Sequence, residues 1–169
     1  SNMEESSLWY EAATREYHSL KKNNTWSIPE IIPSGANIID GKWVFRKKFH
    51  ADGTLKKCKA RYCARGFSQI EGVDYNQTYA PVSSFTSLRV ILSLSASLDY
   101  EIHQMDWETA FLNPTVKEDI YLRLSPGLGY NGIVKLNKCL YGLKQSPFEW
   151  NNEVNTLLCN LGFIASKRD

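Results

Sequence analysis

The fold is organised around Lys42-Trp43-Val44-Phe45-Arg46-Lys47-Lys48-Phe49, which is followed by Ala51-Asp52-Gly53-Thr54 and a return segment over residues 55–65. Aromatic and β-branched residues alternate with basic ones, which is typical of a strand that buries one face. The Asp-Gly pair favours the positive φ of a hairpin turn. The stretch therefore predicts a long β-hairpin, with Trp43 and Phe45 on one face and Lys42, Val44 and Arg46 on the other.

This hairpin also concentrates positive charge, although the whole chain has a net charge of only +2. Its basic residues include Lys42, Arg46, Lys47, Lys57, Lys59, Arg61 and Arg65, while Asp52 is the one acid between positions 42 and 65. A basic, aromatic hairpin in a near-neutral chain is an electrostatic footprint for phosphates. The alternative is a solvated hairpin whose lysines protect sheet edges from pairing.

The bulk composition predicts one soluble globular domain. The chain has 169 residues, of which 43% are hydrophobic and 22% charged, and four cysteines without a C-x-x-C pair. This pattern argues against a zinc site and favours reduced thiols in an intracellular protein, cytoplasmic or nuclear. No apolar run approaches the roughly 20 residues of a membrane span, and no signal segment opens the chain. Ser1-Asn2-Met3 reads as a cloning remnant, which leaves residues 4–169 as the domain.

Hydrophobic periodicity predicts three helices. The first covers residues 8–20 and is capped by Ser6 or Ser7. The second covers residues 83–98, capped by Ser84 or Thr86, with a buried stripe made of Leu88, Ile91, Leu92, Ser95 and Leu98. The last begins at Ser146-Pro147, with serine as the cap and proline at the first helical position, and has Gly162 as its C′ residue.

Further strands are predicted over residues 100–106, 119–124 and 133–136, with a short helix over 107–112. The expected fold class is α+β, an antiparallel sheet with packed helices.

Asp106 stands in the stretch Gln104-Met105-Asp106-Trp107-Glu108-Thr109-Ala110-Phe111-Leu112. An acid before a short apolar run is a candidate helix N-cap. A carboxylate at the end of a strand can equally hold a divalent cation. The local sequence leaves both readings open.

Several ordered motifs decide between these readings. They are Lys42-Trp43-Val44-Phe45, Lys59-Ala60-Arg61 with Arg65-Gly66-Phe67-Ser68-Gln69, Asp74-Tyr75 through Tyr79-Ala80-Pro81-Val82, His103-Gln104-Met105-Asp106 with Thr109-Ala110-Phe111-Leu112-Asn113, and Leu140-Tyr141-Gly142-Leu143-Lys144-Gln145. Together they resemble the reverse transcriptase of copia-type LTR retrotransposons, and the resemblance extends from Trp9 to Asp169.

The resemblance implies the fingers and part of the palm of an RNA-directed DNA polymerase. It implies that Asp106 is a catalytic, Mg²⁺-binding aspartate, that the carbonyl of Trp107 adds a metal ligand, and that Phe111 excludes a 2′-hydroxyl. The remaining implied nucleotide-binding residues are Lys59, Arg61, Tyr141, Gly142 and Lys144. Those expected along the nucleic acid are Lys42, Arg46, Lys47, Lys57 and Arg65. The implied partners of the parent enzyme are an RNA or DNA template-primer and a deoxynucleoside triphosphate.

The sequence departs from the family pattern in one decisive respect. It contains no Asp-Asp pair, so the family's Tyr-x-Asp-Asp turn is absent, and the thumb and RNase H region are not expected within it. Two-metal nucleotidyl transfer needs carboxylates for both ions. We therefore expect a truncated polymerase that is inactive alone, with an open sheet edge that favours a homodimer. The alternative is a non-enzymatic, host-retained domain that binds nucleic acid or a protein.

Overall fold

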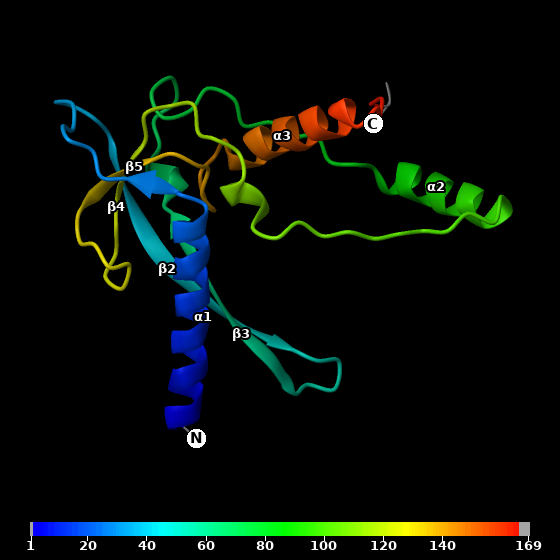
Figure 1. The fold of residues 1–169 in the computed structure, drawn as a ribbon, viewed down its shortest axis with the longest axis horizontal. Coiled ribbons are helices and arrows are strands. Elements are labelled where there is room, and N and C mark those ends of the chain that lie inside the picture. The colour runs from blue at the N-terminus through cyan, green and yellow to red at the C-terminus, as the bar shows by residue number, and fades with distance from the viewer. Residues whose placement is uncertain (1, 166–169) are drawn as a thin grey trace.

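The computed structural model describes residues 2–165 and has mixed α/β architecture (Figure 1). The helices are α1 (Asn2–Lys22), α2 (Phe85–Ser97) and α3 (Ser146–Asn160), with 3₁₀ turns η1 (Gly66–Ser68) and η2 (Ala110–Leu112). The strands are β1 (Trp26–Ser27), β2 (Ile38–Phe49), β3 (Leu55–Ala64), β4 (Tyr121–Arg123) and β5 (Ile133–Leu136). They form one sheet in the order β1-β5-β4-β2-β3.

The sheet is mixed, which corrects the prediction of an antiparallel sheet. The first residues of β2 pair in parallel with β4, Ile38 opposite Tyr121 and Asp40 opposite Arg123. The other strand pairs are antiparallel. A parallel pair needs a long crossover connection, and the chain from β3 through α2 to η2 supplies it.

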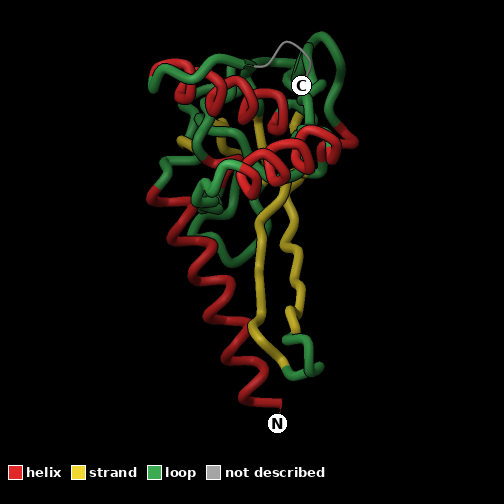
Figure 2. The backbone as a smooth tube through the Cα atoms, turned by 90° about the vertical axis from the view of Figure 1, so that its right-hand side faces the viewer, coloured by secondary structure: helices red, strands yellow, loops and turns green. Residues whose placement is uncertain are grey.

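The predicted hairpin is confirmed as β2 and β3, and it reaches out from the body beside α1 (Figures 1 and 2). Gly53 has a φ of +83° at the turn, and the carboxylate of Asp52 accepts a hydrogen bond from the Thr54 amide at 2.9 Å. Residues at alternate positions of β3 are buried, from Cys58 to Ala64. The hairpin therefore has one covered face and one solvent face.

Helix α1 covers the buried face of the hairpin. Ala12 packs with Cys58 and Ala60, and the ring of Trp9 meets Phe45 edge-on at 5.4 Å. The predicted caps are wrong, because α1 begins at Asn2 and both serines lie inside it. The helix extends through part of the segment that reads as a cloning remnant.

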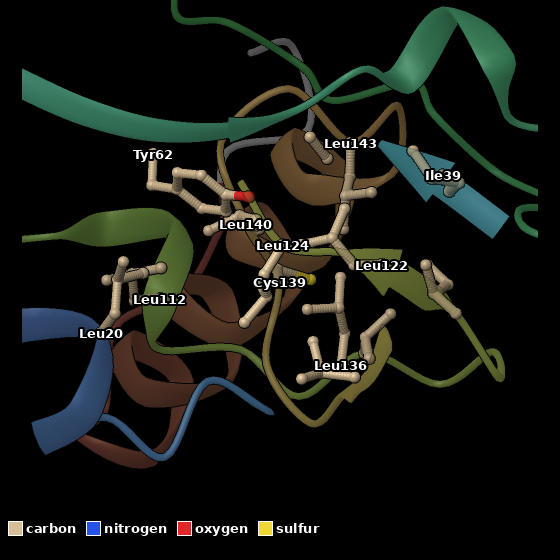
Figure 3. Packing of buried hydrophobic residues seen from close by; sticks show 14 of the residues in the cluster. Leu20, Ile39, Tyr62, Leu112, Leu122, Leu124, Leu136, Cys139, Leu140 and Leu143 are labelled. Carbon is tan, nitrogen blue, oxygen red and sulfur yellow. The ribbon is translucent and has the colours of Figure 1, made fainter. Parts of the chain in front are cut away.

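The main core lies where the sheet, the start of β2 and the loops before α3 converge (Figure 3). Tyr62 is fully buried there, and its hydroxyl accepts a hydrogen bond from the Ser125 amide at 2.8 Å. The apolar members include Leu20, Ile39, Leu112, Leu122, Leu136, Cys139, Leu140 and Leu143. Residues far apart in sequence thus fix the base of the hairpin.

A buried polar network joins the loop that follows β3 to the loop that precedes α3. Asp74, which is 1% exposed, accepts a hydrogen bond from the Ile70 amide at 2.7 Å. Gln145 donates from its amide nitrogen to the Asp74 carbonyl at 2.7 Å, and Gln69 accepts from the Lys144 amide at 2.8 Å. Buried polar groups that are fully paired specify one loop arrangement.

The backbone also makes a close approach at Gly142, which has a φ of +89°. A Cβ at this position would overlap the carbonyl oxygen of Ala64. The Ala64 amide donates to the Tyr141 carbonyl at 2.8 Å. Glycine is therefore required here by both φ and space.

Helix α2 is confirmed in position, but its predicted buried stripe is wrong at every position except Ser95. Ser84 caps the helix, since its hydroxyl accepts from the Ser87 amide at 3.1 Å. Within α2 only Ser95 is buried, and the apolar side chains are at least two-fifths exposed. Figure 1 shows α2 standing apart from the sheet, so within residues 2–165 no sheet surface covers the apolar side chains that the periodicity identified.

Three further local predictions differ from the structure. Residues 100–106 form an extended loop and no strand, because no neighbouring strand pairs with them. The expected helix over 107–112 is reduced to η2. Helix α3 has Pro147 in its first turn as predicted, but its N-cap is Gln145, since the Ser146 hydroxyl donates to the Leu140 carbonyl at 2.7 Å.

The sheet edges are β3 and the two-residue strand β1. Homodimer formation through an open edge stays a prediction. Within the described part of the chain, no helix combines the length and apolar character needed to cross a membrane.

Candidate functional site

A cavity of about 630 Å³ lies where the hairpin, α1 and the loop before η2 meet. Lys48, Lys57, Lys59 and Arg61 line it from the hairpin, and Asp106, Trp107 and Glu108 line it from the loop. Helix α1 adds Ala12, Arg15, Glu16 and Ser19, while Tyr141 comes from the loop before α3. The cavity thus has a basic wall, formed by the four hairpin cations, and an acidic wall, formed by the loop that carries Asp106 and Glu108.

The basic wall follows from strand register. Lys48 lies opposite Lys57, Arg46 opposite Lys59, and Val44 opposite Arg61. Residues opposite each other in a hairpin share a face, so these cations gather on the open face, which is opposite the face where Cys58 and Ala60 pack against α1. Burial lowers the pKa of Lys59 most strongly, and the positive charges of Arg61, Lys48 and Lys57 lower it further. Such crowding favours an anionic ligand.

The acidic wall is exposed. Asp106 makes no hydrogen bond or ion pair with any residue that the structure describes. It is not the cap of η2, whose N-cap residue is Thr109 in the left-handed region at φ +52°. The neighbouring Trp107 meets Trp150 of α3 edge-on at 5.3 Å, which attaches this loop to the body.

Arg61 contacts Tyr141, and Tyr141 contacts Phe111, so these three residues lie together; their roles in nucleotide binding stay predictions. The guanidinium of Arg61 lies 5.0 Å from the centroid of the Tyr141 ring. Tyr141 in turn meets Phe111 edge-on, with centroids 5.3 Å apart. Burial raises the pKa of the Tyr141 hydroxyl, which keeps this side chain neutral.

Three predicted nucleotide-binding residues lie outside the cavity wall, namely Phe111, Gly142 and Lys144. Gly142 packs against Ala64, and Lys144 donates to the Tyr75 hydroxyl at 3.0 Å with its ammonium 4.5 Å from that ring centroid. Both residues therefore shape the loop that carries Tyr141. Their direct contact with a nucleotide stays a prediction.

The residues predicted to follow the nucleic acid divide between the two faces of the hairpin. Lys42, Arg46 and Lys57 share the open face by register. Lys47 lies opposite Cys58 on the face toward α1, where its ammonium is 2.6 Å from Glu5. Arg65 follows the end of β3 and is exposed.

Sequence reasoning missed Arg15, Glu16, Lys48 and Glu108 in the cavity wall. Of these four residues, only Glu16 has a sequence pattern that could have identified it. It stands four positions from both Ala12 and Leu20, which are buried on the same stripe of α1. A charged residue on an apolar stripe calls for a buried partner.

The donor set fits a metal ion that arrives with a phosphate ligand. No group of three or more His, Cys, Asp or Glu suited to a metal occurs among the described residues. Mg²⁺ is commonly held by one or two carboxylates together with substrate phosphates. Asp106, unpaired beside a basic wall, suits that mode.

The model of the family described as "Reverse transcriptase (RNA-dependent DNA polymerase)" matches residues 23–169. The chain belongs to this family. The copia-type resemblance seen in the sequence is confirmed by relatives that are retrotransposon Pol polyproteins. No solved structure gives a significant match.

The relatives are much longer than this chain. It is 37% identical to the retrovirus-related Pol polyprotein from transposon RE1 and 35% identical to that from RE2, both of Arabidopsis thaliana. The match covers 95% of this chain and 11% of each of those relatives. It is 39% identical to the Pol polyprotein from transposon TNT 1-94 of Nicotiana tabacum, over 94% of this chain and 12% of that relative.

Proposed function

We propose that this chain forms the fingers and part of the palm of a retrotransposon reverse transcriptase and binds a deoxynucleoside triphosphate in the cavity. One observation carries the proposal: the cavity brings Asp106 and the basic side chains of the hairpin to the same site. Polymerases of this class need cations for the triphosphate and a carboxylate for the metal.

In this role Lys59 and Arg61 bind the phosphates through charge-assisted hydrogen bonds. Asp106 and the Trp107 carbonyl would hold Mg²⁺, which when bound neutralises charge on the triphosphate. Phe111, which packs on Tyr141, would lie beneath the sugar and reject a 2′-hydroxyl by steric overlap.

The template-primer would lie along the open face of the hairpin. Lys42, Arg46 and Lys57 share this face and lie outside the surface that α1 covers. Contacts to a phosphate backbone bind without reading sequence and weaken with salt. We assign Lys47 no part in this surface, because it lies on the opposite face of the hairpin and is paired with Glu5.

We further propose that this chain alone binds nucleotide without extending a primer. Its sequence has no Asp-Asp pair, and two-metal transfer requires ligands for both ions. Templated incorporation by the isolated chain with Mg²⁺ or Mn²⁺ would refute this part of the proposal.

The binding proposal is tested by titrating the full chain with dTTP and Mg²⁺ at low salt, with a primer-template present. Lys59→Ala and Arg61→Ala should each weaken binding by about 10- to 100-fold, the range for losing a hydrogen bond to a charged group. Lys47→Ala is the matched control on the opposite face and should bind like the natural chain. Absence of triphosphate binding, or equal loss in all three variants, would overturn the proposal.

A further inference from the structure

Glu16 is a buried carboxylate on α1, only 3% exposed, and it is not among the residues that the family resemblance implies for the site. It also precedes residue 23, where the match to the family model begins. A buried carboxylate is costly unless it is paired and hydrogen-bonded. The hydrogen-bond partners of Glu16 therefore indicate its role.

Both oxygens of Glu16 bind consecutive residues of β3. One oxygen lies 2.6 Å from Nη1 of Arg61, and the other accepts a hydrogen bond from the Tyr62 amide at 3.2 Å. The backbone contact fixes the carboxylate relative to the strand. The ion pair then fixes the side chain of Arg61 relative to the carboxylate.

Arg61 is held between this carboxylate and an aromatic ring. Its guanidinium lies 5.0 Å from the Tyr141 ring centroid, so its plane is constrained from two sides. Of its five N–H donors, those on Nη1 donate to Glu16 and to the Ala60 carbonyl. The guanidinium also interacts with the Tyr141 hydroxyl. The side chain is 28% exposed and lines the cavity.

We propose that Glu16 is a positioning residue that orients Arg61 over Tyr141, leaving its remaining donors available to the triphosphate. This role rests on the proposed function of the cavity. A guanidinium already held in place loses less conformational freedom when a ligand binds, so its contribution to affinity is larger. Glu16 acts through Arg61 and touches no ligand itself.

The proposal predicts that the effect of a Glu16 variant on dTTP binding depends on the presence of Arg61. A purely structural role of Glu16 predicts no such dependence. Glu16→Gln should weaken dTTP binding by about tenfold, a part of the loss expected for Arg61→Ala. In a chain that already carries Arg61→Ala, the same change should cause no further loss, because the residue through which Glu16 acts is gone. A role in general stability would instead weaken binding equally in both backgrounds.

The test is a double-mutant cycle on the full chain, measured as the dissociation constant for dTTP with Mg²⁺ and a primer-template. Glu5→Gln is the matched control, since Glu5 also joins α1 to the hairpin through a 2.6 Å ion pair, with Lys47 and outside the cavity. Folding is checked by circular dichroism. If Glu16→Gln does not fold, Glu16→Asp replaces it and should give a smaller loss that also disappears beside Arg61→Ala.

The outcomes separate this role from the proposed function. A natural chain that binds no dTTP overturns both. A natural chain that binds dTTP and loses affinity with Arg61→Ala, but not with either Glu16 variant, overturns only the positioning role. Equal losses in both backgrounds, or an equal loss with Glu5→Gln, also overturn it.

Discussion

Replacing Gly142 with alanine should destabilise the fold far more than a glycine-to-alanine change at an open turn. Gly142 has a φ of +89°, a region that costs an L-residue about 1–2 kcal/mol. The added Cβ would also overlap the Ala64 carbonyl oxygen, so the loop must separate from β3. Overpacking costs about 1–3 kcal/mol, and loss of the Ala64–Tyr141 backbone hydrogen bond adds about 1 kcal/mol.

The expected loss is therefore about 3–6 kcal/mol in the free energy of unfolding, a large part of the stability of a typical domain. Gly35 is the matched control, because its φ is +82° and a Cβ there would meet no atom within 4 Å. Gly35→Ala should cost only the backbone strain of about 1–2 kcal/mol.

Urea unfolding of both variants, followed by circular dichroism, gives the comparison. Equal losses for Gly142→Ala and Gly35→Ala would refute the close approach of the loop to β3. The same loop carries Tyr141, so dTTP binding should also weaken in Gly142→Ala under conditions where the variant is folded.

Three other properties follow from named contacts. Tyr62→Phe leaves the Ser125 amide without its 2.8 Å acceptor and should lower the free energy of unfolding by about 1–3 kcal/mol, measured in urea; no change would contradict the hydrogen bond. Burial raises the pKa of the Cys139 thiol to about 12, so the native protein should alkylate at exposed Cys159 long before Cys139 at neutral pH, as followed by mass spectrometry. Burial lowers the pKa of Lys59, so this side chain loses its charge as pH rises through a range below that of an ordinary lysine. Binding of dTTP should fall in that alkaline range, and Lys59→Arg should bind independently of pH there.

Sequence reasoning succeeded where the determinants are local. The hairpin follows from alternation and from an Asp-Gly turn, both of which act over a few residues. The cap of α2 was found because Ser84 bonds to a residue three positions later. Gly162 was found at the end of α3 because its φ of +91° suits a helix terminus.

It failed where the answer depends on what lies beside an element. The stripe of α2 is periodic, but nothing in the periodicity states which surface covers it. The parallel pairing of β2 with β4 joins Ile38 to Tyr121, a partner that no local pattern specifies. Glu16 escaped notice for the same reason, since its partner Arg61 is 45 positions away.

For the candidate site, family motifs located Asp106, Lys59, Arg61 and Tyr141 around one cavity. They did not separate residues that face the cavity from residues that support its walls. Lys47 and Gly142 show the difference, because strand register and backbone overlap decide where each of them lies. Strand register and backbone overlap arise only when the chain packs, so the spacing of residues along the sequence does not predict them.

The order of strands in the sheet has a consequence for biosynthesis. Strand β1 pairs only with β5, and the Ser27 hydroxyl donates to an Asn137 side chain 110 positions later. At a synthesis rate of about 5–20 residues per second, β1 emerges several seconds before its partner exists. The contacts between α1 and the hairpin join residues of the first part of the chain, so this pair can form early. The sheet is completed only by the segment over β4 and β5, which makes that late segment the step at which a nascent chain becomes committed to the native topology.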